Sequence, residues 1–165
     1  QSLELIKKNG KITCYYTKLE FVITYATNDE FSLKEFIILM KRRKARELAL
    51  QTLFQMDLSE ANASDALEHV LEEAEEKQDA FLEAIVTNFV SHKEVIDEQL
   101  ASNIESWTID RLGNVDRNIL RIALVEITYL EDVPKSVAIN EAIEIAKVYG
   151  DDDSSKFINA VLSKF

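Results

Sequence analysis

Five positive charges fall within six residues of the chain, at Lys41, Arg42, Arg43, Lys44 and Arg46. Arginine suits phosphate recognition because its planar fork is permanently charged and pairs bidentately with phosphate oxygens. At helical spacing, Arg42, Arg43 and Arg46 lie beside or opposite the apolar stripe of the same segment, where they would be free to meet phosphates. The cluster indicates either a nucleic-acid site or a solvated charge run at a helix N-terminus.

The charge of the whole chain limits the nucleic-acid interpretation. The formal net charge is −11, and residues 1–39 carry as many lysines as acidic residues, so the acidic excess lies entirely in residues 40–165. An acidic body repels nucleic acid, and any such site must therefore be a local patch. Basic residues at a helix N-terminus also oppose the helix macrodipole, a cost that makes an incidental cluster less attractive.

A second candidate site is a pair of apolar residues that lies off the main stripe. Leu50 and Phe54 are four residues apart, on the helix side shared by Arg43 and Glu47. If the stripe faces the core, the pair is partly exposed, and an exposed aromatic beside charged residues suits protein docking. The alternative is that Phe54 simply widens the buried face.

Enzyme chemistry finds little support in the sequence. His69 and His92 lie on polar positions with no ligand cluster around them, and the acidic runs at 72–77 and 150–155 are typical of solvated faces or caps. The chain has no phosphate-cradling Gly-rich loop and no nucleophile elbow. The aspartates at 151–153 lack the spacing of a calcium loop. We therefore expect no catalytic residues, no cofactor and no metal.

Composition indicates which elements position these residues. Three Gly and one Pro in 165 residues favour long helices over a sheet-rich fold. From Lys41 on, the pattern predicts an all-α bundle of about seven helices. The first buries Ala45, Leu48, Ala49, Leu53 and Met56; separate helices follow over 79–92 and 93–104; the helix after Asn114 is apolar nearly all round and should form the core. Asp153 or Ser154 is expected to cap the last helix.

Residues 1–39 differ from the rest because they are rich in β-branched and aromatic residues. They predict a strand pair or a loose extended segment, followed by a helical stretch that runs into the basic cluster. We interpret them as a dispensable N-terminal extension, with Met40 as the functional start and 40–165 as the domain. The single Cys14 and the lack of a long apolar run or signal peptide favour a cytoplasmic protein without a membrane partner.

Three segments together resemble the NusB family of bacterial transcription antitermination factors. They are "RRKARELALQTLFQ" at 42–55, "LGNVDRNILRIALVEI" at 112–127 and "DVPKSVAINEAIEIAKVYGDDDSSKFINAVL" at 132–162. The resemblance covers residues 40–165. It implies two three-helix subdomains and binding of the boxA sequence of ribosomal RNA leaders as a heterodimer with NusE, a small-subunit ribosomal protein. It also implies that the heterodimer joins an RNA polymerase complex.

The same resemblance implies which residues form the sites. RNA contacts would be Arg42, Arg43, Arg46, Lys156 and Phe157, and NusE contacts would include Phe54 and Asp116. Phe157 could stack on an unpaired base, or it could belong to the core with Ile158 and Val161. Some members of the family dimerise. The alternative function is a non-enzymatic protein-interaction scaffold or homodimer with no RNA role.

Overall fold

The N-terminal unit of the computed structural model is a small sheet joined to the start of a helix. The structure describes residues 3–8, 11–16, 21–26, 33–59, 61–104 and 109–165, and it divides into two compact units, Gln1–Met40 and Lys41–Phe165. In the first, β1 (Leu3–Lys8), β2 (Lys11–Tyr16) and β3 (Phe21–Ala26) form an antiparallel sheet in that order. The sequence predicted at most a strand pair, and the third strand adds to it.

The second unit is helical, which confirms the all-α prediction for residues 41–165. The described part of the chain contains six α-helices and one short 3₁₀-helix: α1 (Leu33–Ser59), α2 (Ala63–Ala74), α3 (Ala80–Asn103), η1 (Ile109–Arg111), α4 (Asn114–Tyr129), α5 (Lys135–Tyr149) and α6 (Ser154–Leu162). α1 begins in the first unit and continues without interruption into the second. The sequence also predicts Thr108 as the N-cap of a short helix that ends near Gly113, and Thr108 lies outside the described residues.

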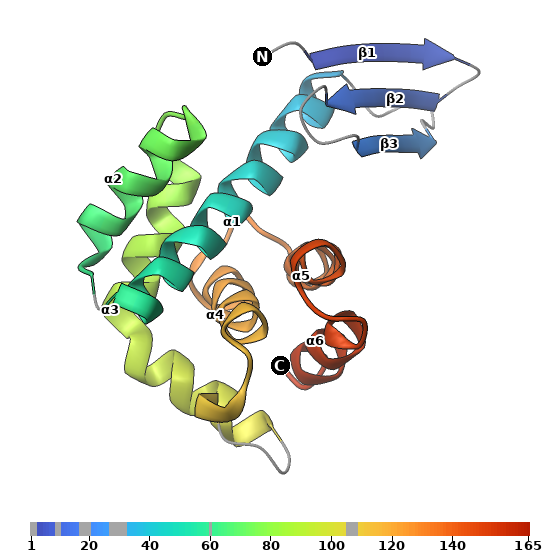
Figure 1. Ribbon diagram of the computed structural model, residues 1–165. Helices are drawn as coiled ribbons and strands as arrows, with labels where there is room; N and C mark the ends of the chain where they lie inside the picture. Colours follow the sequence, from blue (N-terminus) through green and yellow to red (C-terminus); the bar gives the residue numbers. More distant parts are fainter. Residues whose placement is uncertain (1–2, 9–10, 17–20, 27–32, 60, 105–108) are drawn as a thin grey trace. The chain divides into compact units, whose positions relative to one another are not determined.

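Within Lys41–Phe165 the helices form two groups of three. α4, α5 and α6 contact one another and are all seen nearly end-on in Figure 1, whereas α1 crosses the picture with α2 and α3 beside it. α4 is buried over most of its surface, from Asn118 to Glu126, as its apolar pattern predicted. The predicted stripe of α1 is also confirmed, because Ala45, Leu48, Ala49 and Leu53 are buried in the core.

α3 consists of two helical segments that meet at a kink at His92, where the sequence predicted separate helices over 79–92 and 93–104. The backbone of His92 has non-helical angles of φ −127° and ψ 19°. Its side chain accounts for the kink, because Nδ1 lies 3.0 Å from the Asn88 carbonyl oxygen, which would accept the His92 N–H in a regular helix. The His92 ring stacks on Tyr129 of α4 with the centroids 4.2 Å apart, which ties the kink to the core helix.

Gly150 stands between α5 and α6, at a position where the surrounding atoms leave no room for a side chain. Its φ of −93° is open to any residue, so the close approach of its neighbours, and not its backbone conformation, requires glycine here. A Cβ atom there would lie 2.6 Å from Ser154 Oγ and 2.8 Å from the Ala146 carbonyl oxygen. Ser154 is buried, and its Oγ accepts a hydrogen bond of 2.9 Å from the Asp151 N–H.

Gly150→Ala is expected to lower the free energy of unfolding by about 1–3 kcal/mol, because the new methyl group overpacks a rigid junction. Urea denaturation measures this directly. Gly113→Ala is the matched control, since nothing lies within 4 Å of a Cβ at Gly113 and its φ is −54°. That variant should change the free energy of unfolding by less than about 1 kcal/mol, because Ala lowers the entropy of the unfolded chain but is a poorer N-cap residue for α4 than Gly. Equal effects of the two substitutions would show that the close approach at Gly150 carries no cost.

Candidate nucleic-acid interface

The basic cluster lies in the middle of α1 and not at a helix N-terminus. α1 starts at Leu33, eight residues before Lys41, so the expected conflict with the helix macrodipole does not arise. Lys41 is exposed and Lys44 is half-buried, and neither makes an ion pair among the described residues. The three arginines, in contrast, all pair with carboxylates from later parts of the chain.

Arg46 is not free to meet phosphates, which corrects the sequence expectation. Only 1% of the residue is exposed. Its Nε and Nη2 donate hydrogen bonds of 2.8 and 2.7 Å to the two carboxylate oxygens of Glu126 on α4. An arginine can enter the core when a carboxylate meets it bidentately. Burial raises the pKa of Glu126 above its usual value, and the hydrogen bonds and charge of Arg46 oppose that rise.

Arg43 makes a similar pair with α5, so it too has a partner already. Its Nε and Nη2 donate hydrogen bonds of 2.9 and 2.6 Å to Glu141, whose side chain is nearly buried. Glu141 also lies 3.6 Å from Arg46 Nη1 and thereby links the two arginines. The side chains of Arg43 and Arg46 therefore hold α1 against α4 and α5.

Arg42 is the most accessible of the three arginines. It donates a hydrogen bond to Asp132, in the turn between α4 and α5, and both side chains are partly exposed. Its guanidinium carbon lies 4.9 Å from the centroid of the Phe81 ring at the start of α3. Arg42 is thus close to solvent and has both an acidic and an aromatic neighbour.

Lys156 and Phe157, the other residues assigned to RNA by resemblance, lie in the first turn of α6. Lys156 is exposed, and its Nζ donates a 3.0 Å hydrogen bond to Asp153. Asp153 occupies the N-cap position, as predicted, but makes no side-chain capping hydrogen bond. Its carboxylate accepts the hydrogen bond from Lys156 instead. Phe157 is half-buried and packs against the core.

The two residues assigned to a protein partner lie on α1 (Phe54) and in the first turn of α4 (Asp116). Phe54 is half-buried, whereas Leu50 is buried in the core with 4% of its surface exposed. The expectation of a partly exposed pair therefore holds for Phe54 and is wrong for Leu50. Asp116 is half-buried, and its Oδ1 is a buried acceptor with no hydrogen-bond partner among the described residues. One turn beyond Phe54, Asp57 accepts a 3.0 Å hydrogen bond from Arg117, which brings the two segments together.

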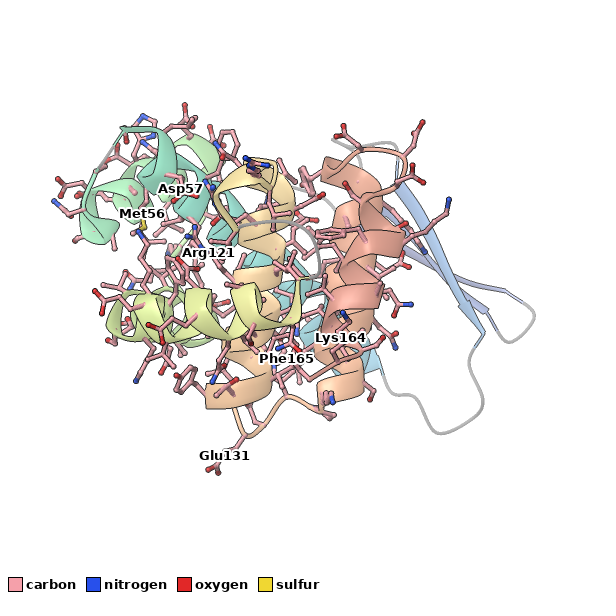
Figure 2. All side chains as sticks on the ribbon, turned by 90° about the horizontal axis from the view of Figure 1, so that it is seen from below. Met56, Asp57, Arg121, Glu131, Lys164 and Phe165 are labelled. Atoms are coloured by element: carbon pink, nitrogen blue, oxygen red, sulfur yellow. The ribbon has the colours of Figure 1, made fainter. Side chains whose placement is uncertain are left out.

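A buried polar network beside these residues escaped the sequence analysis. Arg121 on α4 donates hydrogen bonds of 2.8 and 2.7 Å to Asp97 on α3, and its Nη1 lies 3.0 Å from Asp57 Oδ2 on α1. Figure 2 shows Asp57 and Arg121 side by side. Asn118 donates a further 3.0 Å bond to Asp57. Polar side chains on a helix that is otherwise apolar all round were the signal, because such groups need buried partners.

The network keeps Asp57 ionised. Burial alone raises the pKa of this carboxyl, but the hydrogen bonds from Asn118 and Arg117 and the charge of Arg121 outweigh it, so the pKa lies below its usual value. Arg121 also sits 5.2 Å over the ring of Phe89. The network therefore joins α1, α3 and α4 through one arginine.

Comparison with known proteins shows which fold family has this arrangement. The model of the NusB family matches residues 43–165, which is most of the chain. The chain belongs to the NusB family. The transcription antitermination protein NusB of Oceanobacillus iheyensis is 49% identical over 125 residues, which cover 76% of this chain and 98% of the relative. That of Bacillus subtilis is 50% identical over 124 residues, covering 75% of this chain and 93% of the relative.

Solved structures of the NusB family have the same helical arrangement. NusB of T. maritima superposes with a TM-score of 0.69 at 34% identity, covering 74% of this chain and 88% of that one. A crystal structure of the antitermination factors NusB and NusE in complex with dsRNA gives a TM-score of 0.69 at 31% identity, with coverage of 76% and 95%. These likenesses confirm the expected fold.

Two further observations concern other kinds of site. In the described part of the chain, no helix combines the length and the apolar character that crossing a membrane requires. The same residues contain no group of three or more His, Cys, Asp or Glu that could hold a metal ion.

Proposed function

We propose that this chain is a transcription antitermination factor that binds boxA RNA of ribosomal RNA leaders as a heterodimer with NusE and joins an RNA polymerase complex. The observation that carries the proposal is the family match over residues 43–165, together with the likeness to a structure that contains NusB, NusE and dsRNA. The protein would act by binding rather than by catalysis, and it would work in the cytoplasm, where bacterial transcription takes place.

The geometry supports two different roles for the five residues assigned to RNA, direct contact and positioning of α1. Arg42 and Lys156 are accessible enough for direct phosphate contacts, and Phe157 could stack a base on the exposed part of its side chain. Arg43 and Arg46 would act indirectly, because Glu141 and Glu126 already take their bidentate donors. We propose that these two arginines position α1 so that Arg42 can reach the RNA.

Replacing Arg42 and Lys156 together by alanine is expected to weaken binding of single-stranded boxA RNA. The slope of log affinity against log salt should become shallower by about 1.4, at about 0.7 per phosphate contact on a single strand. Fluorescence titrations over a range of salt concentrations measure this. Lys93→Ala is the control: Lys93 is exposed and lies twelve residues along α3 from Phe81, about 18 Å away. If the slope of the double variant equals that of the wild type, the RNA binds elsewhere.

The same titrations test the proposed extension. We propose that residues 1–39 are not needed, because Lys41–Phe165 forms a compact unit and the family match begins at Arg43. A chain that begins at Met40 should therefore bind the RNA with equal affinity and melt cooperatively. If neither chain binds RNA but both form homodimers, the scaffold function replaces the RNA function.

Phe54→Ala and Asp116→Ala are expected to weaken NusE binding more than they weaken RNA binding by the isolated protein. Phe54 would provide an aromatic anchor. Truncating such a residue near the centre of an interface typically costs about 2 kcal/mol or more of binding free energy. Asp116, which is half-buried, would add a charge contact with the partner. Calorimetric titration with NusE measures both. A large loss of thermal stability in Phe54→Ala with unchanged NusE affinity would instead assign Phe54 to the core.

A further inference from the structure

The three arginines of α1 differ in how firmly their carboxylate partners hold them. Side-chain exposure is 1% for both members of the Arg46–Glu126 pair, and 15% and 8% for Arg43 and Glu141. For Arg42 and Asp132 it is 32% and 62%. Separating a buried pair leaves an uncompensated charge in the core, whereas an exposed pair separates at little cost. Of these three arginines, only Arg42 can therefore exchange its carboxylate for another anion.

Asp132 lies at the tip of a short turn whose backbone is fixed. The Val133 N–H donates a 3.0 Å hydrogen bond to the Leu130 carbonyl, which closes the turn between α4 and α5. Glu131 and Asp132 occupy the two middle positions, and both are exposed. Only Asp132 contacts Arg42, whereas Glu131 has no partner among the described residues and points away from the helices in Figure 2.

Phe81 gives Arg42 a second support that does not depend on Asp132. The ring lies 4.9 Å from the guanidinium carbon, within the range of a cation–π contact. It is half-buried and packs against the core, which fixes its position. Arg42 would thus keep its orientation over the ring if Asp132 were displaced, and the donors turned toward the carboxylate would become available to a phosphate.

We propose that Asp132 competes with RNA phosphate for Arg42, and that RNA binding exchanges the Arg42–Asp132 pair for an Arg42–phosphate pair while Phe81 keeps the guanidinium in place. The proposal rests on the proposed RNA-binding function. It adds two residues, Asp132 as the competitor and Phe81 as a positioning residue. The carboxylate also shields the arginine from other anions, so that binding is weaker but more selective for ligands that offer several contacts at once.

The test is a titration of the full chain with single-stranded boxA RNA at about 0.1 M salt. Asp132→Asn should bind two- to fivefold more tightly, about the effect of removing one exposed ion pair. Glu131→Gln is the matched control, because it removes the same charge from the same turn without touching Arg42. Both substitutions are on the surface and should leave the melting temperature unchanged. The third arm repeats Asp132→Asn in an Arg42→Gln background, where the gain should vanish.

Two results would overturn the competition between Asp132 and phosphate. An equal gain in Glu131→Gln would mean that only the general negative charge of the turn matters. A gain that persists with Arg42→Gln would mean that Asp132 repels RNA directly. Failure of the proposed function looks different, because then the wild-type chain itself does not bind the RNA. A wild type that binds, with a gain specific to Asp132 and dependent on Arg42, supports the inference.

Discussion

Arg46→Ala is expected to lower the free energy of unfolding by about 3–5 kcal/mol, more than other single changes in the basic cluster. The substitution leaves Glu126, of which 1% is exposed, buried in the core without its counter-charge. It also removes the cation that lies 5.0 Å over the Phe81 ring. Chemical denaturation at neutral pH measures the loss.

Two controls separate the loss of a buried pair from the loss of an arginine. Arg42→Ala removes an arginine from the same helix but breaks only an exposed pair, so its cost should stay below about 1 kcal/mol. Arg46→Met combined with Glu126→Met replaces the pair by apolar side chains and should recover most or all of the wild-type stability. If Arg46→Ala were as mild as Arg42→Ala, the pair would not be buried as described.

Arg121→Met is the second change with a large expected effect, about 2–3 kcal/mol at neutral pH, which is below the range for a fully buried pair because Asp57 keeps Arg117 as a partner. It keeps the bulk of the side chain over Phe89 but leaves Asp57 and Asp97 without their shared cation. Lys147→Met is the control, since it removes the same charge from an exposed pair with Glu144 and should cost less than about 1 kcal/mol.

The Arg121 effect should depend on pH in a direction that the pKa of Asp57 fixes. That pKa is lowered in the folded protein from 3.8, so the stabilisation is fully present above this value and is lost as the pH falls through the folded pKa. The gap between wild type and Arg121→Met should therefore narrow below about pH 4. Urea denaturation at pH 7, 5 and 3 checks this. A gap that is constant across this range would mean that Asp57 contributes nothing.

The sequence predicted those features that depend on regular apolar spacing. The stripe of α1 and the buried α4 are examples. In each helix, apolar residues recur at every third or fourth position on the side that faces the core. It could not place Arg46, since the residue that draws this side chain inward is Glu126, eighty positions away. For the same reason, helical spacing alone predicted that Arg46 is free, although its side chain is buried.

Residues at the edge of the apolar face of α1 show that periodicity does not predict the burial of single side chains. Leu50 and Phe54 occupy equivalent positions on α1, yet Leu50 is in the core and Phe54 is half-exposed. What packs against each depends on where other helices end, which local spacing does not record. The RNA and partner residues came from the family resemblance. Without it, the charge pattern indicated the basic cluster and the apolar spacing indicated Phe54.

Because the basic cluster lies inside α1, its peptide groups take no part in recognition. From Lys41 to Arg46 each backbone N–H donates to a carbonyl one turn earlier in the helix. An anion that meets this stretch finds no free amides of the kind that a helix N-terminus offers. It is bound by side chains alone, through their charge, which salt screens, and through the hydrogen bonds of the arginine forks. Contacts of these side chains with phosphates carry no information about the sequence, so a preference for one nucleotide order over another requires contacts with the bases.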